Sequence, residues 1–229
     1  MRFIISLGAI ALIIFSCAKP LKRHPVPFYF AALALVALYL AGTAAGVCGG
    51  LWPYFMPLMQ RCTLAFALFS TVMYVGVLSD SSQLRAKLMP IRRQLSILAC
   101  IFALGHIAFY MQSYAPRGFA VLGGNQGLSL TLAVILIALM VTLLATSFQV
   151  VRRQMNAVSW KRIQRLSYPF YLFTYVHLAL LLGPSALAGK DTAVVSLMVY
   201  SMVVATYVAL RVRRALLRRT KHANTAPAS

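Results

Sequence analysis

The chain has 229 residues, of which 61% are hydrophobic and only 10% are charged. Because a soluble domain carries about 25% charged residues, this composition argues against an ordinary soluble enzyme and predicts a protein that lies in lipid. The net charge of +20 comes from 22 lysines and arginines against two acids, Asp80 and Asp191, and its short basic clusters between apolar runs favour membrane orientation over nucleic-acid binding.

Seven apolar segments follow one another along the chain, and a membrane-spanning helix needs roughly 20 such residues. They cover residues 3–17, 28–48, 62–79, 95–111, 128–150, 166–188 and 193–210. The first is short and begins like a signal sequence, but no A-x-A cleavage site follows it, so we expect an uncleaved span. The sequence therefore predicts an all-α, polytopic bundle of six core spans with an extra N-terminal span.

The connections between these segments alternate between many basic residues and few. Basic residues are frequent at positions 19–23, 85–93, 152–165 and 211–221, whereas the other connections carry one each. Since cytoplasmic loops are rich in lysine and arginine, we expect the C-terminus in the cytoplasm and the chain in the inner or plasma membrane. The expected divisions are an N-terminal span with its basic border at 1–24, a bundle at 25–211 and a disordered basic tail at 212–229.

Little conventional active-site chemistry is available outside the spans. The four cysteines, Cys17, Cys48, Cys62 and Cys100, form no C-x-x-C pair, so neither haem attachment through thioethers nor a zinc site is indicated. Two acids cannot supply paired carboxylates together with a Ser-His-Asp set, and no nucleotide-binding fingerprint is present. Chemistry in this protein is expected inside the bilayer or on a partner.

Two histidines, His106 and His177, interrupt the apolar interior. His106 follows Arg93 by 13 residues, and His177 follows Arg165 by 12 residues. At 1.5 Å per residue both lie roughly 18–20 Å from the cytoplasmic edge, in the outer half of a core about 30 Å thick. Ionisable side chains within spans mark function by default, so this shared depth predicts that the two histidines act together.

Two imidazoles at one depth can bind haem iron from both sides, which would make them metal ligands. Thr174, one turn before His177, is expected to orient that ring, and the small Ala103 and Gly105 are expected to let a ring system approach His106. Two alternatives stay open: the histidines can be interhelical hydrogen-bonding groups or parts of a proton relay, although no intramembrane carboxylate completes one. Spacing alone does not choose among the three.

Two short blocks resemble a known family. The run at 91–95 (IRRQL) precedes the segment that carries His106, and the run at 160–168 (WKRIQRLSY) precedes His177. With the six spans from residue 28 onward, they resemble the ferric-reductase-like transmembrane domain, most closely the haem-binding membrane subunit of the bacterial periplasmic methionine sulfoxide reductase system. The resemblance implies a helical bundle that holds b-type haem and transfers electrons.

One position departs from the family pattern. Where the second block of the family carries a histidine, this chain has Gln164, and glutamine is a poor ligand for haem iron. The resemblance therefore implies one haem b, between His106 and His177. Membrane quinol, or a flavin on the cytoplasmic side near Arg92, Arg93, Arg162 and Arg165, would be the donor, although positive-inside anchoring is the favoured role of these arginines.

The outer face offers two cations, Arg117 and Lys190, and the resemblance suggests that one of them pairs with haem propionates, together with Tyr110, Tyr114 or Trp52. The expected function is an electron-transfer subunit, rather than a complete enzyme, that passes electrons to an extracytoplasmic reductase or flavoprotein. The alternative of another class is a cofactor-free helical membrane protein, such as a small transporter or an assembly subunit, with structural histidines. A proton-coupled transporter is disfavoured because acids and an inverted repeat are missing.

Overall fold

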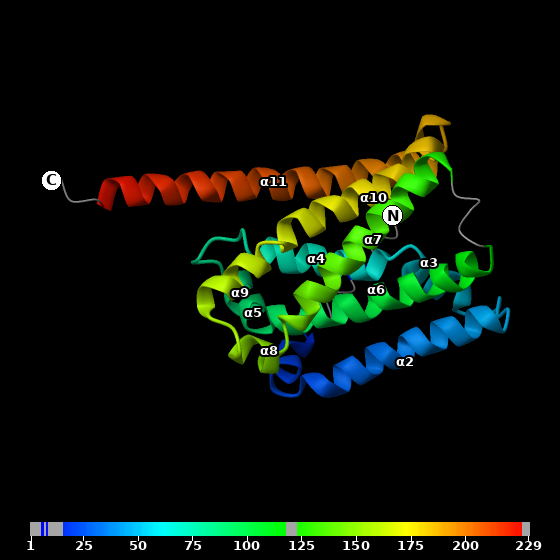
Figure 1. Cartoon of the computed structure of the whole chain (residues 1–229), viewed down its shortest axis with the longest axis horizontal. Coiled ribbons are helices and arrows are strands. Elements are labelled where there is room, and N and C mark those ends of the chain that lie inside the picture. The colour runs from blue at the N-terminus through cyan, green and yellow to red at the C-terminus, as the bar shows by residue number, and fades with distance from the viewer. Residues whose placement is uncertain (1–5, 7, 9–15, 118–122, 226–229) are drawn as a thin grey trace.

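The computed structural model describes residues 6, 8, 16–117 and 123–225, and these are helix or loop without a β-strand among them (Figure 1). Five helical stretches are long and apolar enough to cross a membrane, and a bent pair of helices makes a possible sixth span. The predicted all-α, multi-pass membrane bundle is thereby confirmed. The extra span expected at 3–17 lies almost entirely outside the described residues.

The described residues form long helices that are joined by shorter helices and loops. The long ones are α2 (Pro25–Ala44), α6 (Arg92–Tyr114), α7 (Gly124–Ala145), α10 (Ser167–Leu187) and α11 (Asp191–Thr225). The shorter ones are α3 (Trp52–Gln60), α4 (Thr63–Val75), α5 (Gln83–Leu88), η1 (Met89–Ile91), η2 (Ala115–Arg117), α8 (Gln149–Arg153) and α9 (Ala157–Gln164). Proline lies in the first turn of α2 and of α3, where its fixed φ angle suits a helix start.

The third predicted span differs from the observed one. In place of a single helix at 62–79, α3 and α4 form a pair bent by 55°, and Cys62 at the bend has a positive φ of 54°. Helix α4 alone is 13 residues long, about 20 Å, which is shorter than the apolar core of a bilayer. Arg61, which marks the border of the predicted span, lies at the bend between the two halves.

The basic tail also differs from its expectation. Residues 212–225 continue α11 as helix to Thr225, whereas the sequence interpretation has disorder from residue 212; residues 226–229 lie outside the described part. Leucine, alanine and arginine, which fill the start of this tail, are all strong helix formers. A helix already running through the membrane is therefore extended without a new nucleation step.

The helices pack as two groups. Helix α6 packs against α2 and α4, and α10 packs against α7 and α11. The groups meet through α4: the buried hydroxyls of Ser70 and Tyr171 share a hydrogen bond of 2.9 Å, and the Tyr74 hydroxyl donates to the Val203 carbonyl on α11 at 2.6 Å. Since 44% of the residues in the α6 span are buried, against 17% in α2 and in α7, α6 is the central helix.

The basic connections gather at one end of the bundle. Figure 1 places α5, α8 and α9 at the same end as the C-terminal half of α11, and α3 toward the opposite end. At the basic end Asp80 accepts from Arg85 at 3.0 Å and from Arg214 at 2.7 Å, which fastens the α4–α5 connection to α11. The alternation of basic connections in the sequence thus corresponds to two chemically different ends in space.

Candidate functional site

His106 and His177 belong to different helix groups. His106 is on α6 and His177 is on α10, and both side chains are half-buried. Helices α6 and α10 are not among the closely packed pairs of the described helices, yet the two imidazoles lie close enough to interact electrostatically. The two histidines therefore come from different helix groups and lie within electrostatic reach of each other.

The ring of His106 is fixed by a backbone carbonyl. Its Nδ1 lies 2.7 Å from the carbonyl oxygen of Gln60, the last residue of α3. A carbonyl only accepts, so Nδ1 carries the hydrogen and donates it, and Nε2 keeps its lone pair. The bend after Gln60 interrupts the regular helical hydrogen bonding that would otherwise occupy this carbonyl, so the bent span creates the partner of His106.

The ring of His177 is fixed in the same way from α7. Its Nδ1 lies 3.0 Å from the carbonyl oxygen and 2.9 Å from the hydroxyl oxygen of Ser129, a residue that is 2% exposed. The carbonyl again requires the hydrogen to be on Nδ1, which leaves the lone pair on Nε2. Both imidazoles are consequently held in the tautomer whose Nε2 carries no hydrogen, the form in which a histidine can bind a metal.

The two histidines suit a metal that receives most of its ligands from a cofactor rather than from the protein. Among the described residues no three histidine, cysteine or acidic side chains come together, so a zinc-type site built from protein ligands alone has no basis in this part of the chain. Haem iron takes four nitrogens from its macrocycle and needs only one or two axial ligands from the protein. Two imidazoles with available Nε2 atoms fit that requirement.

Aromatic rings extend from His106 along α6. The ring of Tyr110 lies edge-on to the imidazole with 4.9 Å between centroids, and Tyr114 stacks on Tyr110 at 5.7 Å. Gly105 does not serve the predicted approach of a ring system: a Cβ there would lie 3.0 Å from the Val36 side chain on α2. The small residue instead allows α2 and α6 to pack closely.

The structure gives His177 a hydrogen-bonding partner other than Thr174, the residue that the sequence predicts. The hydroxyl of Thr174 donates to the Phe170 carbonyl of its own helix at 2.8 Å, whereas Ser129 holds the His177 ring. Sequence reasoning missed Ser129 and Gln60, because one is an ordinary helix serine and the other acts through its backbone.

Of the two cations predicted on the outer face, Lys190 is exposed, and the side chain of Arg117 lies outside the described part of the structure.

The cytoplasmic-side residues singled out from the sequence do not form one group. The Gln164 amide donates to the Thr146 hydroxyl at 3.0 Å, which ties α9 to the end of α7. Arg93, Arg162 and Arg165 are exposed, whereas Arg92 is half-buried. The exposed three suit anchoring at the membrane surface, and Arg92 has a different environment.

The fold and the site define a multi-pass helical membrane protein with a histidine pair between two helix groups. The chain belongs to the family of the ferric reductase like transmembrane component, whose model matches residues 61–175. The matched region contains His106 and ends two residues before His177. The family predicted from the sequence blocks is thereby confirmed.

One relative has a similar sequence along nearly the whole chain. It is an uncharacterized protein of Treponema pallidum (strain Nichols), 35% identical over 233 aligned residues that cover 96% of this chain and 62% of the relative. The chain therefore spans less than two thirds of the relative's length. No solved structure matches the chain.

Proposed function

We propose that the protein is a b-type haem subunit that transfers electrons through the membrane. The observation that carries the proposal is the matched state of His106 and His177, each of which donates Nδ1–H to a backbone carbonyl and keeps the Nε2 lone pair available. The two rings are thus held by the same kind of bond from different helices, as a pair of ligands to one metal group would require. Membership of the ferric reductase like family supports the same function.

The residues around the pair have separate tasks in this proposal. Nε2 of His106 and of His177 would hold the haem iron from α6 and α10, and the Gln60 and Ser129 carbonyls keep both rings oriented and basic. Bound haem supplies one-electron redox chemistry between two apolar helix groups. The apolar surroundings exclude water and favour the less charged state of the site.

The proposed direction of transfer rests on the membrane orientation that the basic residues favour. With the basic end of Figure 1 in the cytoplasm, the histidine pair lies toward the outer face of an inner or plasma membrane. Electrons would enter from membrane quinol or a cytoplasmic-side donor and leave to an extracytoplasmic reductase or flavoprotein. The chain would carry electrons, and the partner would complete the reaction on a substrate.

One haem per chain is the expected stoichiometry. At the level where two-haem relatives are expected to have inner ligands, this chain has Gln164, and its amide is engaged with Thr146. We expect a purified preparation in detergent to show sharp b-type bands in reduced-minus-oxidised spectra, and extraction to yield one haem for each polypeptide. Two haems would contradict the assignment of Gln164, and a colourless, folded preparation from haem-replete cells would favour the cofactor-free alternative.

The Ser129 hydroxyl gives a milder test. Ser129→Ala removes one contact of His177 and keeps the carbonyl contact, so we expect the b-type spectrum to persist while haem affinity falls by about tenfold, as for other outer-shell partners of metal-bound histidines. Thr174→Ala is the matched control on the helix of His177, and its affinity should equal that of the wild type. Haem titration of the two apoproteins measures both; a larger loss in Thr174→Ala than in Ser129→Ala would reverse the assignment.

A further inference from the structure

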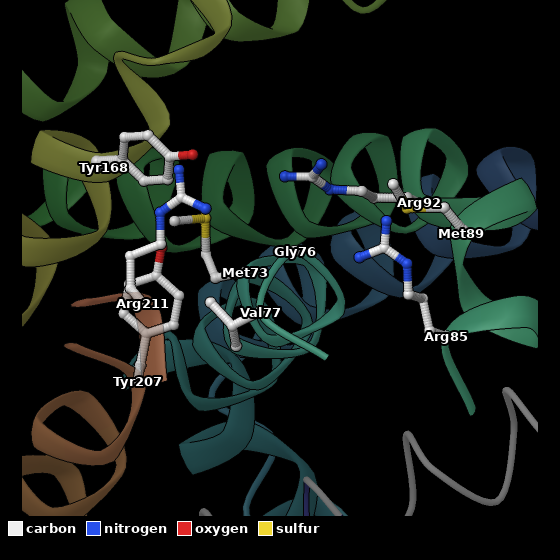
Figure 2. A pocket seen from close by; sticks show the side chains of 9 residues that line it. All are labelled: Met73, Gly76, Val77, Arg85, Met89, Arg92, Tyr168, Tyr207 and Arg211. Carbon is white, nitrogen blue, oxygen red and sulfur yellow. The ribbon is translucent and has the colours of Figure 1, made fainter. Parts of the chain in front are cut away.

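A second feature lies at the basic end of the bundle, away from the histidine pair. It is a partly open cavity of about 200 Å³, lined by residues of α4, α5, α6, α10 and α11 and of the connections beside them. Three arginines line it, Arg85, Arg92 and Arg211, with the rings of Tyr168 and Tyr207 beside them. Figure 2 shows Arg85 and Arg92 extending from α5 and α6 on one side and Arg211 from α11 on the other.

The charge of this cavity is not balanced by its own lining. No carboxylate is among the lining residues, and Arg92 lies within electrostatic reach of both Arg85 and Arg211. The chain has only two acids: Asp80 binds Arg85 and Arg214, and Asp191 begins α11, 20 residues and therefore about 30 Å before Arg211. Asp80 offsets part of the charge of Arg85, but no acid lies among the lining residues beside Arg92 and Arg211. Bringing these like charges together at a membrane surface is unfavourable unless an anion joins them.

The arginines are also held in place. The Arg211 guanidinium lies over the Tyr168 ring, 4.6 Å from its centroid, and Arg85 donates to the Leu78 carbonyl at 3.3 Å. Guanidinium groups that are fixed before binding lose little freedom when they form several hydrogen bonds to one anion. The tyrosine hydroxyls can add donors from α10 and α11.

The size of the cavity limits its ligand. Sites for whole cofactors or drug-sized molecules measure about 300–1,000 Å³, which is more than the volume of about 200 Å³ in this partly open cavity. A tetrahedral phosphate group is smaller, and its oxygens match the paired donors of arginine. We propose that Arg85, Arg92 and Arg211 bind a phosphate group, either that of an anionic phospholipid or free phosphate from the aqueous phase.

The position supports both sources. The cavity lies between the helices at the end where the basic connections gather, at the level expected for lipid headgroups, and basic pockets between helices on this side bind acidic lipid headgroups in other membrane proteins. Neither the pocket nor its ligand depends on haem at the histidine pair, so its test is independent of the proposed electron transfer.

The experiment uses the full chain, delipidated in a neutral detergent. Inorganic phosphate and short-chain phosphatidylglycerol are titrated separately, with short-chain phosphatidylcholine as the zwitterionic comparison, and thermal unfolding reports saturable binding. We expect Arg92→Gln to weaken binding by at least about tenfold, since hydrogen bonds to charged groups are the strong ones. Arg93→Gln is the matched control: it removes the same charge from the neighbouring, exposed position.

A second pair protects the test against misfolding. If Arg92→Gln does not fold, Arg211→Gln is compared with Arg213→Gln, an exposed arginine two residues further along α11. If the pocket variant binds phosphate more weakly than its control does, free phosphate is a ligand of the pocket. If the pocket variant binds phosphatidylglycerol more weakly than its control does, the lipid headgroup is a ligand. Binding of neither probe to the wild type, or equal losses in pocket and control variants, would overturn the proposal.

Discussion

His106→Ala and His177→Ala should each lower the affinity for haem by more than about a hundredfold, which exceeds the usual effect of an outer-shell partner. Each substitution removes one of the two nitrogens proposed to hold the haem iron, and the other histidine alone would hold it less tightly. The sharp bands of a six-coordinate b-type haem should disappear from reduced-minus-oxidised spectra of both variants. Retention of those bands in either variant would exclude that histidine as a ligand.

Two controls separate ligation from general damage. His24→Ala changes an exposed histidine at the start of α2 and should leave the haem content at the wild-type level. His177→Met keeps an axial ligand, because methionine also binds haem iron and raises its reduction potential. We expect this variant to retain haem at a higher potential, which a purely structural histidine would not produce, and redox titration of the purified protein measures the difference.

The histidine pair could be predicted because its signal is strong in the sequence. An imidazole within an apolar run is rare and costly. Counting residues from the basic borders of the two spans puts His106 and His177 at one depth. The orienting groups could not be found in this way. Ser129 is one of several serines in apolar helices, and Gln60 contributes a backbone carbonyl, which every residue possesses.

Neither the bend between α3 and α4 nor the arginine-lined cavity could be predicted from the sequence. The break between α3 and α4 depends on the positive φ of Cys62, a conformation for which cysteine has no special preference. Arg85, Arg92 and Arg211 come from three separate segments, and each resembles an ordinary positive-inside residue when its own segment is considered. Only the packing of α5, α6 and α11 distinguishes them from the exposed Arg93 and Arg213.

Gly42 and Gly46 have the spacing of a Gly-x-x-x-Gly helix-packing motif, but the structure gives Gly42 a different partner. Gly46 lies beyond the end of α2 with a positive φ of 67°. Gly42 is buried within α2, where the ring of Trp52, the first residue of α3, lies against it. A Cβ at Gly42 would lie 2.7 Å from Cζ3 of that ring, closer than two carbon atoms can approach.

Gly42→Ala should therefore destabilise the protein by about 1–3 kcal/mol, the usual cost of overpacking a filled site. Trp52 has little room to yield, because its ring contacts Tyr39 at 6.5 Å and Phe55 at 5.8 Å between centroids. For a chain of this length the loss corresponds to a fall in Tm of roughly 2–12 °C. Gly183→Ala is the matched control, since no atom lies within 4 Å of a Cβ at that position in α10, and its Tm should stay level or rise.

The same substitution should reach the histidine site through α3. Trp52 begins this helix and Gln60 ends it, so a displaced Trp52 shifts the carbonyl that holds Nδ1 of His106. We expect Gly42→Ala to bind haem more weakly than Gly183→Ala while the position of the b-type bands is unchanged, because both axial nitrogens remain. Haem titration and thermal unfolding of the two variants measure the two effects, and equal values in both would show that α3 neither packs through Gly42 nor orients His106.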